Sequence, residues 1–187
     1  MKIKSLAIEG SWLAESPIWF DHRGYFREWF KSEDIEKSVG YSFNPQQANI
    51  SSSSEGTIRG IHYSLAEEGQ AKWITCVSGS IRDFVVDIRP SSATFGKWVA
   101  VELAAESGQA VLIGQGLGHA FVSLQENTTV AYLLSSPYSP NDEFEINPMD
   151  PDIGIKWGTD YSKLNISEKD KSAPSLHQRR LRMQLPS

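Results

Sequence analysis

The sequence has almost no cysteine: Cys76 is the single one among 187 residues. One cysteine excludes an intramolecular disulfide framework and any multi-cysteine zinc or iron–sulfur site. Long hydrophobic runs are also missing, since no apolar stretch approaches the roughly 20 residues that span a bilayer. Residues 1–6 lack the hydrophobic region and cleavage site of a signal peptide, so we expect a cytoplasmic protein with no membrane association.

Positive charge is in the minority, with 18 Lys and Arg against 23 Asp and Glu, a formal net charge of −5. Nucleic acids and anionic membranes bind cationic surfaces, so this balance argues against both as general partners. A local cationic pocket for a small anionic ligand is still compatible with it, because binding responds to the local field.

Helical patterns are weak, and short runs rich in Val, Ile, Phe, Trp and Thr alternate with turn residues. That rhythm predicts an all-β sandwich or barrel with a few short peripheral helices. We expect strands at 46–52, 58–63, 71–78, 81–88, 97–103, 109–113, 118–124 and 128–135.

Residues outside these strands predict little regular structure. A short helix is expected at 33–39, with Ser32 as N-cap and Gly40 just past its end. Another turn or two is expected within 160–171. The four prolines of 137–158 predict a long ordered loop. The length fits one domain, 1–187, in which about 172–187 form a C-terminal tail, either a strand or arm on a partner or a disordered end.

Two histidines lie in settings that suit chemistry. His62 ends a predicted strand, and Lys72 begins a neighbouring one, so the two side chains suit a base and an electrophile held by a rigid sheet. His119 follows three glycines within residues 114–118, a turn that suits either a phosphate-binding loop or a plain hairpin. By themselves, these histidines, Tyr132 and Asp170 are more typical of structural or surface residues than of catalytic ones.

A required metal ion is not expected. His62 and His119 are two ligands at most, and Ser64 stands where metal-binding cupin barrels carry a second histidine two positions on. Glu67 or Glu68 is the remaining candidate for a third ligand, and metal sites usually have three or more.

Eight segments resemble, in order and spacing, the dTDP-4-dehydrorhamnose 3,5-epimerase family of sugar-nucleotide epimerases. They cover about residues 18–175 and are FDHRGYFRE (20–28), QANIS (47–51), GTIRGIHY (56–63), GQAK (69–72), DIRPSSATFG (87–96), GLGHAF (116–121), YSPNDE (138–143) and LNISEKD (164–170).

The resemblance implies a cupin-type jelly roll that works as a homodimer, with about 1–45 as strands and a short helix packed on the partner. It implies an isomerase without a cofactor. The substrate would be a dTDP-4-keto-6-deoxyhexose of the dTDP-L-rhamnose pathway, epimerised at carbons 3 and 5 through an enolate.

The resemblance also assigns roles. His62 matches the general base, Asp170 its partner carboxylate, Lys72 the cation near the ketone oxygen, and Tyr132 the general acid on the far face. Tyr138 matches the aromatic ring that stacks on thymine. The residues matched to other substrate contacts are Arg23, Phe26, Glu28, Gln47, Asn49, Arg59, His119, Glu143 and Lys169.

The roles matched to Arg59 and His62 place both side chains at one site, whereas a regular strand would point them to opposite faces. Gly60 suits a bulge that brings them together. The chain also departs from the family at Gly114-Gln115, in Gly118-His119-Ala120-Phe121 and at Trp73. These departures fit a different sugar, or a single-carbon 3- or 5-epimerase of a modified deoxysugar pathway. Two further alternatives are a 3,4-ketoisomerase on the same barrel and a non-catalytic nucleotide-sugar-binding cupin.

Overall fold

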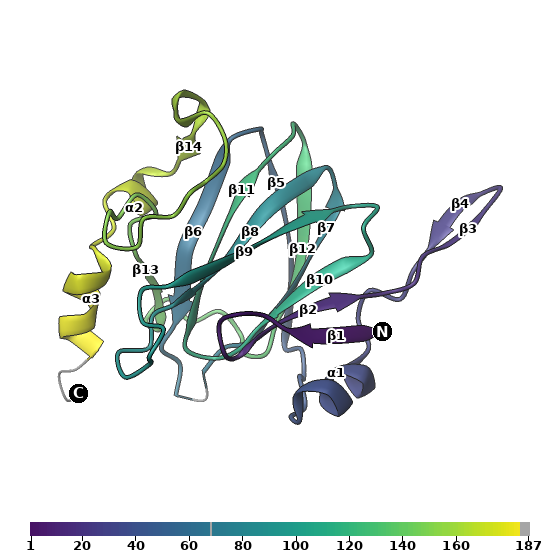
Figure 1. The fold of residues 1–187 in the computed structure, drawn as a ribbon, viewed down its shortest axis with the longest axis horizontal. Helices are drawn as coiled ribbons and strands as arrows, with labels where there is room; N and C mark the ends of the chain where they lie inside the picture. The colour runs from purple at the N-terminus through teal and green to yellow at the C-terminus, as the bar shows by residue number, and fades with distance from the viewer. Residues whose placement is uncertain (68, 184–187) are drawn as a thin grey trace.

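Two β-sheets packed face to face form the body of the protein in the computed structural model, which describes residues 1–67 and 69–183 (Figure 1). The first sheet runs in the order β1 (Lys2–Ser5), β2 (Ser11–Glu15), β10 (Gln109–Ile113), β7 (Lys72–Ser78), β12 (Thr128–Leu134) and β5 (Gln47–Ser53). The second runs β13 (Glu143–Glu145), β6 (Thr57–Ser64), β11 (Leu117–Ser123), β8 (Ser80–Asp87) and β9 (Trp98–Ala104), with β14 (Asn165–Ile166) parallel to β6.

The expected all-β jelly-roll architecture is confirmed, and each of the eight expected strands forms within about one residue of its predicted bounds. Alternate residues of each strand point between the sheets, so Ile74 and Cys76 of β7 join Ile81 and Val85 of β8 in one buried core. Polar residues at inward positions of the same strands face this interior, and they build the site described below.

Helix α1 (Ser32–Val39) covers the outer face of the first sheet. Its Ile35 is fully buried in a cluster with Phe43 and Trp73. The helix ends at Gly40, as expected, whose φ of 84° allows its N–H to reach the Glu36 carbonyl. The expected N-cap is wrong, because the helix starts at Ser32 itself and Lys31 occupies the cap position without a side-chain hydrogen bond.

Residues 146–157 and Leu176 pack on the outer face of the second sheet. Phe84 of that face packs edge-on against Trp157, with ring centroids 4.9 Å apart. The segment expected as a loop at 137–158 contains one short strand, β13, because its residues pair with Ser64, Tyr63 and His62 of β6. The turns expected within 160–171 are the 3-10 helix η1 (Tyr161–Lys163) and α2 (Glu168–Lys171).

The C-terminal segment differs from the strand, arm or disordered end that its sequence suggests. It forms α3 (Leu176–Met183), whose start is a capping box in which Gln178 N–H donates to Ser175 Oγ and Ser175 N–H to Gln178 Oε1. Buried Arg179 then donates to the Glu145 carbonyl and holds α3 against β13. Residues 184–187 of the expected tail lie outside the described residues.

No helix in the described part of the chain is long and apolar enough to cross a membrane.

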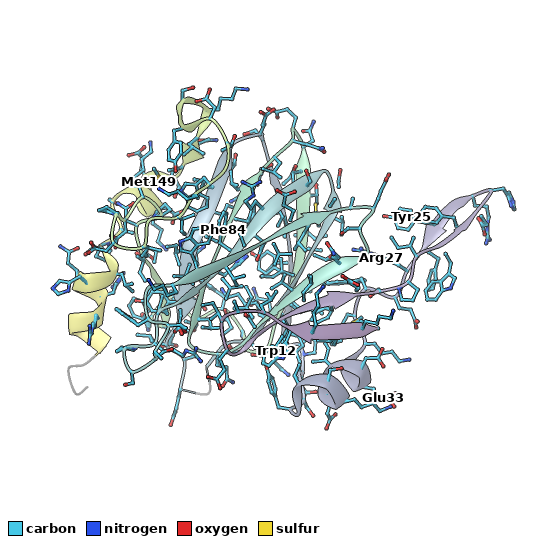
Figure 2. All side chains as sticks on the ribbon, viewed as in Figure 1. Trp12, Tyr25, Arg27, Glu33, Phe84 and Met149 are labelled. Carbon is cyan, nitrogen blue, oxygen red and sulfur yellow. The ribbon has the colours of Figure 1, made fainter. Side chains whose placement is uncertain are left out.

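A two-stranded hairpin, β3 (Trp19–Asp21) and β4 (Gly24–Phe26), projects away from the body (Figure 1). All of its residues are exposed, and Phe20 and Phe26 are 71% and 65% accessible. Figure 2 shows Tyr25 out on this arm, whereas Arg27 lies where the chain returns to the sheet and donates to Thr75 Oγ1 at 2.8 Å.

Strand β6 contains the bulge that the sequence predicted at Gly60. Along the β6–β11 ladder Arg59 pairs with Phe121 and His62 with His119, so β6 carries one more residue than β11 between these pairs. The extra residue restores Arg59 and His62 to the same inward face. Gly60 has a φ of 126°, and a Cβ there would lie 2.5 Å from the Ala120 Cβ and the His119 carbonyl oxygen.

We predict that Gly60→Ala lowers the free energy of unfolding by about 3 kcal/mol, because it adds a steric clash to an unfavourable backbone conformation. Gly24→Ala is the matched control, since Gly24 has a φ of 127° with nothing within 4 Å of the added Cβ. Chemical denaturation measures both variants. Equal losses of stability in the two variants would show that the close contact of residue 60 with Ala120 and the His119 carbonyl does not affect the free energy of unfolding.

Candidate active site

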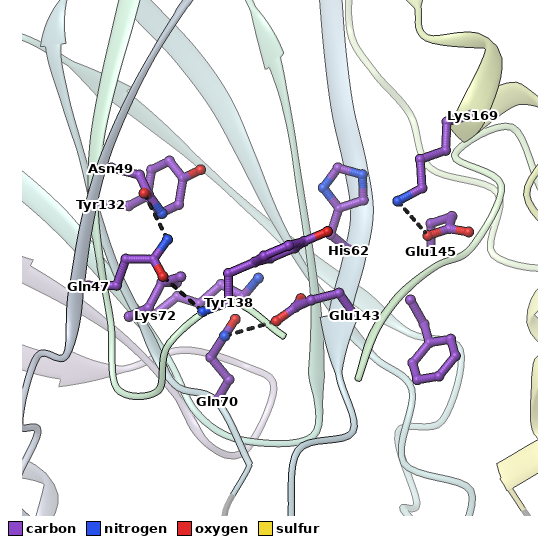
Figure 3. Close-up of a pocket in the computed structure, with 12 residues that line it drawn as sticks. Gln47, Asn49, His62, Gln70, Lys72, Tyr132, Tyr138, Glu143, Glu145 and Lys169 are labelled. Carbon is purple, nitrogen blue, oxygen red and sulfur yellow. Dashed lines mark hydrogen bonds and ion pairs between the residues drawn. The ribbon is translucent and has the colours of Figure 1, made fainter. Parts of the chain in front are cut away.

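Two adjoining cavities open between the sheets. The first has a volume of about 200 Å³, and Figure 3 shows the side chains around it. The second, of about 150 Å³, lies deeper against β11 and is also lined by Ser51, Arg59, His119 and Phe121. Three side chains line both cavities: His62, Lys72 and Tyr132.

His62 is paired with the carboxylate of Asp170. Its Nε2 lies 2.8 Å from Asp170 Oδ1, and the carboxylate side chain is only 5% exposed whereas the imidazole is 41% exposed. A buried carboxylate on one ring nitrogen fixes the imidazole orientation and stabilises its protonated form. The other ring nitrogen is left for a ligand in the cavity.

Asp170 is held in place by the start of α2 and by the β6 bulge. Its backbone N–H donates to Ser167 Oγ, the side chain that caps the helix. Burial alone would raise the pKa of Asp170, but hydrogen bonds from His62, Ser167 and the Gly60 N–H outweigh it and keep this pKa below its usual range. The carboxylate therefore stays ionised beside His62.

Lys72 enters the cavities from the first sheet, opposite His62. Its side chain is buried, with 8% of the residue exposed, and burial lowers the pKa of its ammonium while the nearby Glu143 carboxylate raises it. A cation at such a site stabilises negative charge that develops on a bound oxygen.

Tyr132 also comes from the first sheet, so it faces His62 of the second sheet across the cavities. Burial raises the pKa of its phenol, and Arg59 and a hydrogen bond with Asn49 only partly offset this, so the group stays protonated at neutral pH. A protonated phenol and an imidazole therefore approach the same space from opposite sides.

His119 has a carboxylate partner of its own that the sequence analysis missed. Its Nε2 lies 2.6 Å from Asp83 Oδ2, and the Asp83 side chain is fully buried. A carboxylate at an inward position between the core residues Ile81 and Val85 is a signal that sequence reasoning can use, because such groups are rarely buried without a partner.

The remaining residues matched to the cavities form polar contacts around them. Arg59 crosses between the sheets, from β6 to Ser53 Oγ and the Ser52 carbonyl of β5. Gln47 accepts from the Tyr138 N–H and donates to Asn49, which places the Tyr138 ring at the cavity (Figure 3). Two further pairs complete the rim and floor: Lys169–Glu145 at 3.2 Å and Gln70–Glu143 at 3.0 Å.

Three matched residues are not brought to these cavities. Arg23 and Phe26 lie on the projecting hairpin and Glu28 just after it, and none of them lines either cavity. Arg23 instead forms an exposed ion pair with Asp21. The Trp73 side chain points away from Lys72 into the core beneath α1, so this departure from the family does not line the cavities.

The described residues contain no group of three or more His, Cys, Asp or Glu arranged to hold a metal ion. Glu68, one of the two candidates for a third ligand, lies outside the described residues. Gln70 and Glu145 were also missed, although Gln70 belongs to a segment that carries the family resemblance.

Comparison with known proteins identifies a family for the chain. The family model described as dTDP-4-dehydrorhamnose 3,5-epimerase matches residues 5–178. The chain belongs to this family. It is 46% identical over 171 residues to a dTDP-4-dehydro-6-deoxyglucose 3-epimerase of Streptomyces bikiniensis, covering 91% of this chain and 87% of the relative.

Solved structures are similar along the whole chain. The RmlC epimerase of Mycobacterium tuberculosis superposes with a TM-score of 0.95 at 39% identity, covering 100% of this chain and 94% of that one. ChmJ, a 3'-monoepimerase of Streptomyces bikiniensis in complex with dTDP-quinovose, superposes with a TM-score of 0.91 at 43% identity, covering 97% and 91%.

The lowered pKa of Asp170 predicts how Asp170→Asn changes stability with pH. A carboxylate whose folded pKa lies below its unfolded value stabilises the fold above the unfolded pKa of about 3.9, and this contribution is lost as the pH falls through the folded value. Chemical denaturation at pH 7 should therefore show a larger gap between wild type and variant than at pH 3. Asp152→Asn, which removes an exposed carboxylate, is the control. If the difference in the free energy of unfolding between wild type and Asp170→Asn stays constant with pH, the ionised form of Asp170 does not stabilise the fold.

Proposed function

We propose that this protein epimerises a dTDP-4-keto-6-deoxyhexose at carbons 3 and 5, by removal of a proton and its return from the opposite face. One observation carries the proposal: His62, with its carboxylate partner, and Tyr132, a protonated phenol, line the same cavities from opposing sheets. Inversion at carbon needs a base on one side and an acid on the other.

Each step uses a residue of the cavity. The ketone at carbon 4 acidifies the neighbouring C–H bonds, and His62 takes one of these protons while Asp170 stabilises the imidazolium. The electron pair moves onto the ketone oxygen, where Lys72 stabilises the resulting enolate. Tyr132 then delivers a proton to the other face of the carbon, and both groups return to their starting states by exchange with water.

The diphosphate of the nucleotide is anionic, so its binding requires basic groups beside the reacting ones. Arg59 and His119 line the deeper cavity, and Arg59 is suited to bidentate contact with phosphate oxygens. Tyr138, at the mouth of the first cavity, is suited to stack on the thymine ring. The solved relative with bound dTDP-quinovose supports this substrate class.

A second candidate is epimerisation at carbon 3 alone. The observation that favours it is the 46% identity to a dTDP-4-dehydro-6-deoxyglucose 3-epimerase. Both reactions use the same base, cation and acid, so they differ in which C–H bond the bound sugar presents to His62.

Solvent exchange tests both candidates. We predict that the protein, incubated with dTDP-4-keto-6-deoxyglucose in D₂O, incorporates deuterium at carbons 3 and 5, which NMR distinguishes. His62→Asn should slow the incorporation about 10²–10⁴-fold, because the general base is lost. His177→Asn, an exposed histidine on α3, is the control and should match wild type. Exchange at carbon 3 alone favours the second candidate, and exchange at neither carbon rules out epimerisation.

We also propose that two copies of the chain form a homodimer in which each hairpin reaches the cavity of the other. Support comes from the hairpin's exposed aromatic residues and from the position of Arg23, Phe26 and Glu28 outside the cavities of their own chain. Exposed apolar patches of this kind typically mark protein interfaces.

Mixing two defective variants tests the shared site. Arg23→Ala damages the arm and His62→Asn damages the cavity, so each homodimer should be nearly inactive. After subunit exchange, half of the dimers are mixed and each carries one intact arm–cavity pair, so roughly a quarter of wild-type activity should return. Activity that stays at the level of the separate variants would contradict a site built from two chains.

A further inference from the structure

Gln70 is a buried polar residue for which the proposed reaction has no role. It precedes β7, is 4% exposed, and lines the first cavity. Its Nε2 donates to Glu143 Oε1 at 3.0 Å and reaches the Ser136 carbonyl at 3.5 Å. The reversed amide orientation would set two acceptor oxygens against each other, so the contact with Glu143 defines the orientation.

Glu143 and Lys72 line the same cavity, and the charge of this carboxylate raises the pKa of the lysine. Of the two glutamates that line the first cavity, Glu145 is already paired with Lys169 and Arg179. The other charged or titratable groups that line the cavities with Lys72 are phenols or carry positive charge when protonated: Tyr132, Tyr138, Arg59, His62, His119 and Lys169.

Lys72 itself has no ion-pair partner within 4.0 Å among the described residues. Burial favours its neutral form, which carries no positive charge to stabilise an enolate oxygen. The Glu143 carboxylate acts in the opposite direction. Its effect depends on where its oxygens lie, because Coulomb energy in a buried site changes steeply with distance.

We propose that Gln70 is a positioning residue: its amide fixes the Glu143 carboxylate beside Lys72, so that the lysine remains charged where the enolate oxygen forms. This inference rests on the proposed function for its catalytic meaning, but the charge state of Lys72 is a property of the protein alone. Without the Gln70 amide, Glu143 turns toward solvent on its short edge strand, and Lys72 loses protons at lower pH.

An NMR titration of lysine labelled with ¹³C at Cε tests the proposal without reference to activity. The Lys72 signal is assigned by its absence in Lys72→Met. Gln70→Met, of similar size but without the amide, should lower the Lys72 titration midpoint by about half a pH unit, a roughly threefold change in its ionisation ratio. Gln109→Met, which removes an exposed Gln–Glu contact with Glu15 at 3.5 Å, is the matched control and should leave the midpoint unchanged.

A second variant covers a failure of Gln70→Met to fold. Glu143→Gln should lower the Lys72 midpoint at least as much, and Gln70→Met added to it should lower it no further. An unchanged midpoint in Gln70→Met, or in Glu143→Gln, overturns the proposal.

If the midpoint falls and the wild type shows no deuterium exchange, the positioning role holds and the proposed function is the part that fails. If the wild type is active, the basic limb of kcat in Gln70→Met should move down by the same half unit, with KM nearly unchanged.

Discussion

The extra residue in β6 at Gly60 is the constraint on which the site depends. It turns Arg59 and His62 to the same face of the strand, and it frees the Gly60 N–H to donate to Asp170. One backbone irregularity therefore places a cation, orients a base and supports the base's carboxylate. Only glycine fits there, because Ala120 and the His119 carbonyl leave no room for a Cβ.

The cavity between the sheets is lined by basic side chains, although the chain as a whole is acidic. The protein carries a net charge of −5, yet Arg59, Lys72, His62 and His119 line a single deep cavity. A carboxylate lies next to three of these groups: Asp170 contacts His62, Asp83 contacts His119, and Glu143 lies near Lys72. Arg59 and Lys72 supply basic groups to a cavity whose two imidazoles are each paired with a carboxylate, an arrangement suited to an anionic sugar nucleotide.

Sequence patterns predicted the eight long strands well, because alternation of apolar residues along a strand is a local signal. They also predicted the bulge, since Gly60 stands between two residues that chemistry needs on one face. They failed for β13, because a three-residue strand exists only through its pairing with β6. The capping box of α3 was readable in Ser175 and Gln178, but the polar composition of the tail obscured it.

The buried partners of His119 and Glu143 were harder to predict, because Asp83 and Gln70 lie 36 and 73 residues away from them in the sequence. No local pattern encodes such distances. The residues matched through the family, by contrast, did assemble around the cavities, apart from the three on or beside the hairpin. Their separation from the cavities is what a site completed by a second copy would require.

The central claim is that a sugar ring binds between His62 and Tyr132. A crystal structure of the protein with a dTDP-linked 6-deoxyhexose tests it most directly. We predict that carbon 3 of the ring lies between the two side chains, within reach of the free imidazole nitrogen on one face and the phenol on the other, with the oxygen at carbon 4 near Lys72. A ring bound with both side chains on the same face would contradict it.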